Sequence, residues 1–244
     1  MDVVLISYLV AVAVSFAVGA PTLVRALRAR DTPLVLLGAA VSFDAFEWLV
    51  WTLACYTPAY ETPLGFALSV ACRLGIIASV LCLILFTRSV FRPHSAAAQA
   101  FALLIAGALV LSVVGSGALG DWEGVRNDHV WVWLEQIALM TGYGWTSLEA
   151  GRAYRLTKRR ARYGLGDAMT AHRQLLWSIY AGMFFLAEGV YVITLAFYGM
   201  LSDLDSLNAA ITVFAQLALG AAVFAPRWYV RRVCSGSEAA RTGQ

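Results

Sequence analysis

Long apolar runs separated by short polar stretches occur seven times along the 244 residues of the chain. Each run is close to the length of about 20 residues that a helix needs to cross a bilayer. We expect helical segments at about Val3–Leu27, Pro33–Tyr56, Leu64–Phe86, Ala97–Leu119, Val130–Gly151, Gln174–Met200 and Leu207–Phe224. The predicted fold class is an all-α integral membrane protein with seven transmembrane helices.

Composition supports this prediction. Hydrophobic residues make up 60% of the chain and charged residues only 14%, whereas a soluble domain has about 25% charged residues. The N-terminus lacks the basic region and cleavage site of a signal peptide, so the mature chain is expected to begin at Met1. Seventeen arginines against one lysine, with abundant Ala, Val and Leu, indicate a GC-rich bacterial genome. We therefore expect a multi-pass protein of the bacterial inner membrane.

The basic residues are distributed unevenly between the two sides of the segments. With the N-terminus outside, 16 of the 18 lysines and arginines lie on the cytoplasmic side, and Arg73 and Arg126 are the exceptions. The positive-inside rule therefore predicts an N-out, C-in topology. We expect one transmembrane domain over residues 1–226 and a basic, then disordered, cytoplasmic tail over residues 227–244.

Four ionisable side chains are expected deep inside the bilayer. Asp44 and Glu47 share one face of the second segment, Arg73 lies in the third and Glu188 in the sixth. At about 1.5 Å of rise per residue, Glu47, Arg73 and Glu188 lie roughly 13–18 Å below the outer surface and Asp44 a turn deeper. Such groups cost at least about 2.5–3.5 kcal/mol in lipid, so they normally face the bundle interior and have a partner or a function.

Two interpretations of these four residues stay open. In one, Arg73 pairs with Asp44 or Glu47 and only fastens two helices. In the other, the four residues form a ligand or proton site in the outer half, where three acids beside one arginine favour a shared proton. Aromatic side chains near them serve either as pocket lining or as packing and interface anchors. The candidate lining residues are Trp48, Trp51, Glu135, Gln136, Tyr143, Tyr180, Phe184, Tyr191 and Gln216.

The stretch Arg152–Arg173 is expected to form a basic cytoplasmic loop. Its charges either fix the topology and contact anionic lipid, or dock a cytoplasmic or membrane protein partner. The loop is too short to suggest nucleic-acid binding, and Glu149 just before it is expected to meet Arg152 or Arg25. The candidate residues of this loop are Arg152, Arg155, Lys158, Arg159, Arg160 and Arg162.

A faint repeat relates the first three segments to the last three. Val50-Trp-Thr-Leu-Ala-Cys-Tyr56 aligns with Val192-Ile-Thr-Leu-Ala-Phe-Tyr198, which brings Glu47 within one residue of Glu188. Ala-rich helices also align by chance, but a real relation would be a parallel 3+1+3 repeat. This architecture resembles a broad seven-helix group that includes SWEETs, PQ-loop proteins and microbial rhodopsins. The chain has no Pro-Gln pair, and its one lysine, Lys158, lies outside the last segment, which excludes covalent retinal.

Patterns typical of enzymes are weak. His94, His129 and His172 lie at membrane edges or in loops, and the four cysteines show no metal-binding or disulfide spacing. Gly115-Ser116-Gly117 lacks a catalytic frame and is expected to serve helix packing. No cofactor and no metal are predicted. The first expectation is a transporter of a small solute or a proton-coupled transporter, and the alternatives are a seven-helix sensor that signals through the basic loop or an accessory subunit of a membrane complex.

Overall fold

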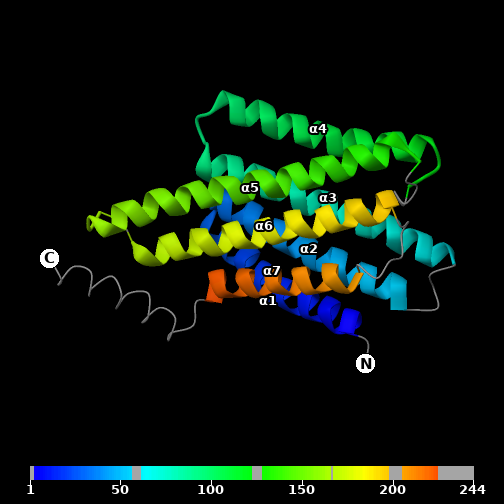
Figure 1. Ribbon diagram of the computed structural model, residues 1–244, viewed down its shortest axis with the longest axis horizontal. Coiled ribbons are helices and arrows are strands. Elements are labelled where there is room, and N and C mark those ends of the chain that lie inside the picture. The colour runs from blue at the N-terminus through cyan, green and yellow to red at the C-terminus, as the bar shows by residue number, and fades with distance from the viewer. Residues whose placement is uncertain (1–2, 57–61, 123–127, 166, 198–204, 225–244) are drawn as a thin grey trace.

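The computed structural model describes residues 3–56, 62–122, 128–165, 167–197 and 205–224, and this part of the chain contains helices and no strands. Figure 1 shows the helices running side by side along one long axis. The predicted helical class and the seven helices are confirmed. Their bounds are α1 Val3–Ala29, α2 Thr32–Tyr56, α3 Pro63–Phe91, α4 Ala96–Ala118, α5 Val130–Arg162, α6 Ala168–Phe197 and α7 Asp205–Phe224.

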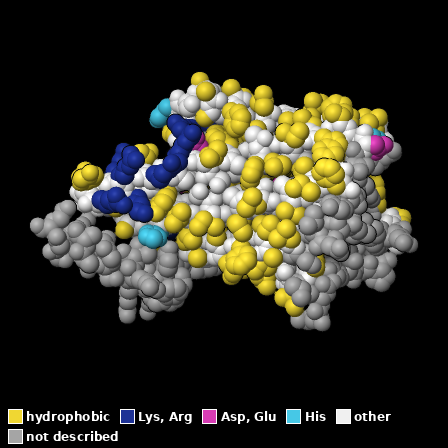
Figure 2. All heavy atoms as spheres, in the orientation of Figure 1, with side chains coloured by type: hydrophobic (Ala, Val, Ile, Leu, Met, Phe, Trp, Pro, Cys, Tyr) yellow, Lys and Arg dark blue, Asp and Glu magenta, His cyan; other side chains and the backbone are white. Residues whose placement is uncertain are grey.

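Five of the seven helices, α1, α2, α3, α4 and α6, are long and apolar enough to cross a membrane. The other two helices are α5, whose last third is basic, and α7, whose apolar stretch Ala210–Val223 is shorter than these five spans. Large apolar side chains on the flanks are well exposed, among them Leu104 at 68%, Leu103 at 63% and Ile137 at 61%. Figure 2 shows apolar side chains spread over the visible flank of the bundle. This surface is compatible with a polytopic membrane protein, because lipid solvates exposed apolar side chains.

Six helices close a ring, and α4 lies outside it. In the ring, α1 packs on α2, α2 on α3, α3 on α5, α5 on α6, α6 on α7, and α7 on α1. The outer helix α4 packs against α3 and α5 (Figure 1). Side chains that point inward from these six helices therefore share one enclosed interior.

Small residues allow close contact between helices. A Cβ atom on Gly38 would lie 2.5 Å from the backbone nitrogen of Leu23, so α1 and α2 touch there through their backbones. On α4, a Cβ atom on Gly115 would meet the ring of Trp131 at 2.3 Å, and one on Gly117 would meet another tryptophan ring at 2.5 Å. The predicted packing role of these two α4 glycines is confirmed.

Short connections begin and end with capping residues. Asp31 accepts a hydrogen bond from the backbone of Leu34, and Ser95 and Asp167 cap α4 and α6 in the same way. Gly120 and Gly164 follow α4 and α5 with φ of 78° and 73°, a conformation that favours glycine at helix ends. The connections α1–α2, α3–α4 and α5–α6 thus contain few residues.

The expected basic loop is largely wrong, because α5 continues through it. The helix runs to Arg162 and α6 begins at Ala168, which leaves only residues 163–167 as the connection. With 33 residues, α5 is about 50 Å long, well beyond the roughly 30 Å hydrocarbon core of a bilayer. Figure 1 shows this end of α5 extending past the neighbouring helices, and Figure 2 shows Lys and Arg gathered there. The six basic residues assigned to the loop lie on this helical extension.

We call the end of the bundle where α1, α3 and α5 end and α2, α4 and α6 begin the basic end. Apart from Arg73, every Lys and Arg among the described residues lies at this end. The predicted tail, residues 227–244, and Arg126 lie outside the described residues. The basic-end residues are Arg25, Arg28, Arg30, Arg88, Arg92, Arg152, Arg155, Lys158, Arg159, Arg160, Arg162 and Arg173.

Candidate functional site

The deep charged residues divide into two clusters, and the first surrounds Arg73. Nε of Arg73 donates to Glu135 Oε2 at 2.9 Å, and Nη2 donates to Glu135 and, at 3.1 Å, to Ser116 Oγ. Nη1 donates to the carbonyl oxygens of Asp121 at 3.2 Å and Trp122 at 3.1 Å. A guanidinium has five N–H donors, so this arginine cluster uses all of them.

The interpretation in which Arg73 pairs with Asp44 or Glu47 is wrong. Arg73 binds Glu135 of α5 instead, and Ser112 of α4 donates to the same carboxylate at 3.1 Å. The long arginine side chain reaches from α3 toward the end of the bundle where α5 begins, as arginines near membrane surfaces do. The cluster joins α3, α4 and α5 and leaves Arg73 no donor for a ligand.

The second cluster, which we call the carboxylate cluster, consists of Ser15, Asp44, Glu47, Glu188 and Gln216. Asp44 is 1% exposed, and its Oδ2 accepts from Ser15 Oγ at 2.7 Å and from Gln216 Nε2 at 3.0 Å. Ser15 Oγ also lies 2.9 Å from Gln216 Oε1. These contacts form a triad that connects α1, α2 and α7.

The triad has room for one extra proton. A hydroxyl carries one hydrogen, so Ser15 can donate either to Asp44 or to Gln216. With a proton on Asp44 Oδ2, Asp44 donates to Ser15, Ser15 donates to Gln216, and the Gln216 amide donates back to Asp44. All three contacts are then hydrogen bonds at once. The triad can thus accept or release a proton while its atoms stay in place.

Glu47 and Glu188 differ from the other deep carboxylates because neither forms a hydrogen bond or ion pair with any described residue. Glu47 lies against α3, where a Cβ on Gly75 would be 3.2 Å from its Cβ, and it interacts electrostatically with Glu188. Glu188 is only partly buried although it lies on the inward face of α6. That face also carries the buried side chains of Tyr180, Ala181, Phe184 and Leu195.

Several polar atoms in this half of the bundle are buried without a hydrogen-bond partner. A buried polar atom without a partner costs about 1–3 kcal/mol, so each calls for an explanation. Thr212 lies one turn from Gln216 on the same face of α7, at the level of Trp48 on α2. The Trp48 indole lies near Asp44 but makes no hydrogen bond of normal geometry. The atoms are Asp44 Oδ1, Trp48 Nε1, Gln136 Oε1, Asn208 Oδ1 and Thr212 Oγ1.

Aromatic side chains fill the centre of the ring between these groups. Tyr143 stacks on Phe184 with ring centroids 5.1 Å apart, and Phe184 contacts Tyr180 edge to face at 5.1 Å. Tyr180 in turn contacts Trp177 at 5.6 Å. Tyr143 also interacts electrostatically with three carboxylates of the cluster. Of the predicted lining residues, Tyr143, Tyr180 and Phe184 form the packed core, while Trp51 and Tyr191 are half-buried.

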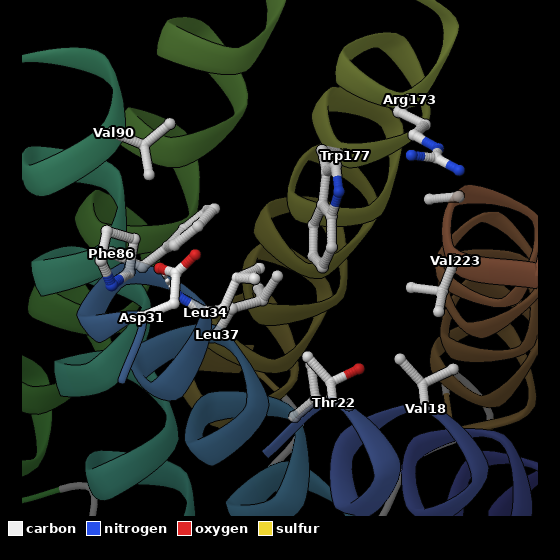
Figure 3. A pocket seen from close by; sticks show the side chains of 13 residues that line it. Val18, Thr22, Asp31, Leu34, Leu37, Phe86, Val90, Arg173, Trp177 and Val223 are labelled. Atoms are coloured by element: carbon white, nitrogen blue, oxygen red, sulfur yellow. Dashed lines mark hydrogen bonds between the residues drawn. The ribbon is translucent and has the colours of Figure 1, made fainter. Parts of the chain in front are cut away.

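A cleft of about 570 Å³ opens at the basic end, and no sequence feature predicted it. Figure 3 shows Trp177 and Arg173 of α6 facing Val223 of α7, with Val18 and Thr22 of α1 beside them. Its walls are mostly apolar, and in the sequence an apolar residue that lines a cleft looks the same as one that faces lipid. The charged lining residues are Asp31 and Arg173.

The floor of the cleft lies close to the triad. Val18 and Val41 line the cleft and lie three residues, less than one helical turn, from Ser15 and Asp44. Trp177 is likewise three residues from Tyr180. Along α2, Asp44 of the triad thus lies between the cleft residue Val41 and Glu47.

The remaining predicted ion pair is confirmed. Glu149 Oε1 accepts from Arg152 at 2.9 Å, and Arg92, which the sequence did not suggest, donates to Oε2 at 2.9 Å. At the other end His129 lies 3.5 Å from Asp121. Among the described residues no group of three or more His, Cys, Asp and Glu could hold a metal ion.

Comparisons with known proteins give no match to a family model, a curated protein or a solved structure. The two clusters and the cleft are therefore the features that bear on function. Of the two, the arginine cluster is saturated with hydrogen bonds, and the carboxylate cluster is not. The second cluster is the candidate site.

Proposed function

We propose that the chain is a seven-span membrane protein that moves a small solute, or protons coupled to it, through the interior of its helical ring. One observation carries the proposal: Glu47 and Glu188 lie on inward helix faces without a hydrogen bond or ion pair to any described residue. Ionisable residues inside a membrane domain that lack a structural partner are typical of solute and proton pathways.

The cleft supports translocation rather than simple binding. It reaches from the basic end to within about one turn of the Ser15–Asp44–Gln216 triad, on the far side of which lie the unpaired carboxylates. A transporter needs a site that opens to one side at a time. We propose that the triad closes the passage between the carboxylates and the cleft, and that gaining or losing its proton favours opening.

Orientation and repeat belong to the same proposal. We place the basic end in the cytoplasm, which gives N-out and C-in, because short cytoplasmic segments carry the excess of Lys and Arg.

The halves α1–α3 and α5–α7 meet where α3 packs on α5 and where α7 packs on α1. Arg73–Glu135 bonds the first junction and Ser15–Gln216 the second, and the repeat alignment places Arg73 within one residue of Gln216. These matched junctions support a parallel repeat.

Proton flux in reconstituted vesicles tests the proposal. We expect vesicles that contain the chain and an internal pH-sensitive dye to dissipate an imposed pH gradient faster than empty vesicles. The double variant Glu47→Gln, Glu188→Gln should lose most of this flux, since it keeps the shape but not the titrating groups. The control Glu149→Gln changes a carboxylate already paired with Arg92 and Arg152 and should retain the flux. Equal flux in the double variant and the wild type would refute the proposal.

A second candidate, a sensor that signals to a protein partner, is favoured by the α5 extension. This helix carries Arg152, Arg155, Lys158, Arg159, Arg160 and Arg162 beyond the apolar part of the bundle. A rigid basic helix suits docking to an acidic protein surface better than a mobile loop does, because less conformational freedom is lost on binding. Ligand binding without flux in the same vesicles would favour the sensor.

A further inference from the structure

The carboxylate cluster has no positive charge of its own. Arg73 uses all its donors within the arginine cluster, and the other described Lys and Arg side chains lie at the basic end. We infer that the ligand of this cluster is a small organic cation with N–H donors, of the protonated amine or guanidine class, and that it exchanges with protons. This inference rests on the proposed site and names its ligand.

The unpartnered atoms around the cluster are the first argument for N–H donors. Gln136 is 6% exposed and Thr212 is 1% exposed, and an oxygen of each lacks a hydrogen-bond partner. Asn208 Oδ1 is a further unpartnered acceptor. The Thr212 hydroxyl can donate or accept, and Asp44 Oδ1 and the Trp48 indole lie near each other without a hydrogen bond of normal geometry. A ligand that satisfies such a surface must donate hydrogen bonds. An ammonium or guanidinium group does so, and an anion or a quaternary ammonium does not.

Register brings these acceptors toward the two carboxylates. Thr212 lies one turn from Gln216, whose amide reaches Asp44, and it therefore faces the level of Trp48 and Glu47 on α2. Gln136 lies seven residues before Tyr143 on the same face of α5, and Tyr143 interacts with the carboxylate cluster. The acceptors thus come from α2, α5 and α7 and point into one interior.

Aromatic rings favour an organic cation over a metal ion. Tyr143 and Tyr180 both interact electrostatically with Asp44 and Glu47, and the Trp48 ring lies on the same side of α2. A cation near aromatic faces gains about 0.5–2 kcal/mol. A metal ion would instead need several ligands held around one point, and among the described residues no group of three or more His, Cys, Asp and Glu could hold one.

Proton exchange follows from the chemistry of the carboxylates. A proton and a cationic N–H group compete for the same oxygens of Glu47 and Glu188, so binding of one reduces binding of the other. Cation affinity should therefore fall as the pH falls. The titratable groups that interact electrostatically with Glu47 or Glu188 are Asp44 on α2, Glu135 and Tyr143 on α5, and Tyr180 and Tyr191 on α6. The next groups are Tyr8 on α1, which stacks on Trp48, and Cys72 and Arg73 on α3, which interact with Tyr191. From α7 the nearest polar groups are the uncharged Gln216 and Thr212.

Binding to the purified full-length chain in detergent tests the inference. The probes are phenethylammonium, guanidinium, the N-trimethylated form of phenethylammonium and uncharged phenethyl alcohol, measured by calorimetry between pH 6 and 8. We expect saturable binding of phenethylammonium or guanidinium, at least tenfold weaker binding of the trimethylated and uncharged compounds, and up to about a tenfold loss of affinity per pH unit on acidification when one proton is displaced. Glu47→Gln and Glu188→Gln should each weaken binding at least tenfold, and Glu149→Gln should not.

The outcomes separate the inference from the proposed function. Failure of both N–H cations to bind, equal binding of phenethyl alcohol, or affinity that is independent of pH and of Glu47 and Glu188 would overturn the inference. Proton flux in vesicles could still be present, and the transport proposal would then stand. Binding as expected without any flux would support the inference and refute transport.

Discussion

At the scale of single residues, hydrogen-bond partners distinguish Arg73, a structural charge, from Glu47, for which we propose a function. Arg73 and Glu47 lie at similar depth, yet Arg73 bonds two carboxylate oxygens, a hydroxyl and two carbonyls, whereas Glu47 bonds none of the described residues. A saturated charge is held in one geometry. An unsaturated charge can exchange partners, and this exchange is what translocation requires.

The arginine cluster should behave as a replaceable structural contact. Removing one partner of a buried ion pair costs about 3–5 kcal/mol, whereas replacing both with apolar residues is often neutral. We expect Glu135→Leu to destabilise the chain more than Arg73→Leu, because a guanidinium cannot lose its proton and Glu135 can gain one. The double variant should melt closer to the wild type than either single variant does. Melting curves in detergent check this order.

A matched control for the arginine cluster is the pair at the basic end. The side chain of Arg92 is 44% exposed and bonds Glu149, so Arg92→Leu should cost less than about 1 kcal/mol. A double variant of Arg73 and Glu135 that melts as low as the worse single variant, and no longer binds cations, would instead place Arg73 in the functional site.

The sequence predicted the inward-facing carboxylates but not the partner of Arg73. Asp44, Glu47 and Glu188 could be predicted because a charge inside an apolar segment has to avoid lipid. Glu135 lies only six residues into α5, nearer the membrane surface than Arg73, so the sequence suggested it only as a lining residue of the site. The arginine side chain spans that difference in depth, so rise along the helix alone was a poor guide.

At the scale of helices, the apolar part of a segment and the helix itself can end at different residues. The apolar part of α5 ends near Gly151, but Arg, Lys, Ala and Leu form helices well, so the helix continues to Arg162. Membrane boundaries could therefore be read from the sequence, whereas the end of this helix could not. The same helix passes from the interior of the ring to the basic surface.

The start of α6 offers a pH-dependent test of capping. Asp167 accepts from Thr170 Oγ1 at 2.7 Å and from the backbone nitrogens of Thr170 and Met169. These hydrogen bonds, first that from the Thr170 hydroxyl, lower the pKa of Asp167, and Arg173 adds to the effect. A lowered folded-state pKa means that the stabilisation is complete above the unfolded-state pKa and is lost as the pH falls through the folded-state pKa.

We expect Asp167→Ala to cost about 1 kcal/mol at neutral pH, the typical value of an N-cap. This deficit should shrink at a pH low enough to protonate Asp167 in the folded chain. Asp167→Asn also caps the helix but does not titrate, so its deficit relative to the wild type should be small at neutral pH. Melting curves of the three chains across pH provide the measurement. An Asp167→Ala deficit that grows on acidification would contradict this account of the cap.

At the scale of the whole molecule, seven apolar runs predicted seven helices but not their arrangement. The ring of six with α4 outside depends on which small faces meet, for example Gly38 against Leu23, and many Ala- and Leu-rich faces look alike in sequence. The cleft at the basic end depends on that arrangement and was likewise beyond prediction. The basic residues that the sequence assigns to one side of the membrane lie at one end of the bundle wherever they are described. The difference between the two ends therefore gives the clearest test of topology.

The two ends of the bundle should differ in access from outside the cell. Leu119, after α4, is 56% exposed, and Leu165, between α5 and α6, is 79% exposed, so a cysteine at either position is open to a reagent. In a chain whose four native cysteines are replaced by alanine, an impermeant thiol reagent should label Leu119→Cys in intact cells and Leu165→Cys only after permeabilisation. The reverse pattern would invert the orientation and put the basic end outside. Labelling of both positions in intact cells would contradict a membrane crossing by α5, and the ring could then not enclose a transmembrane path.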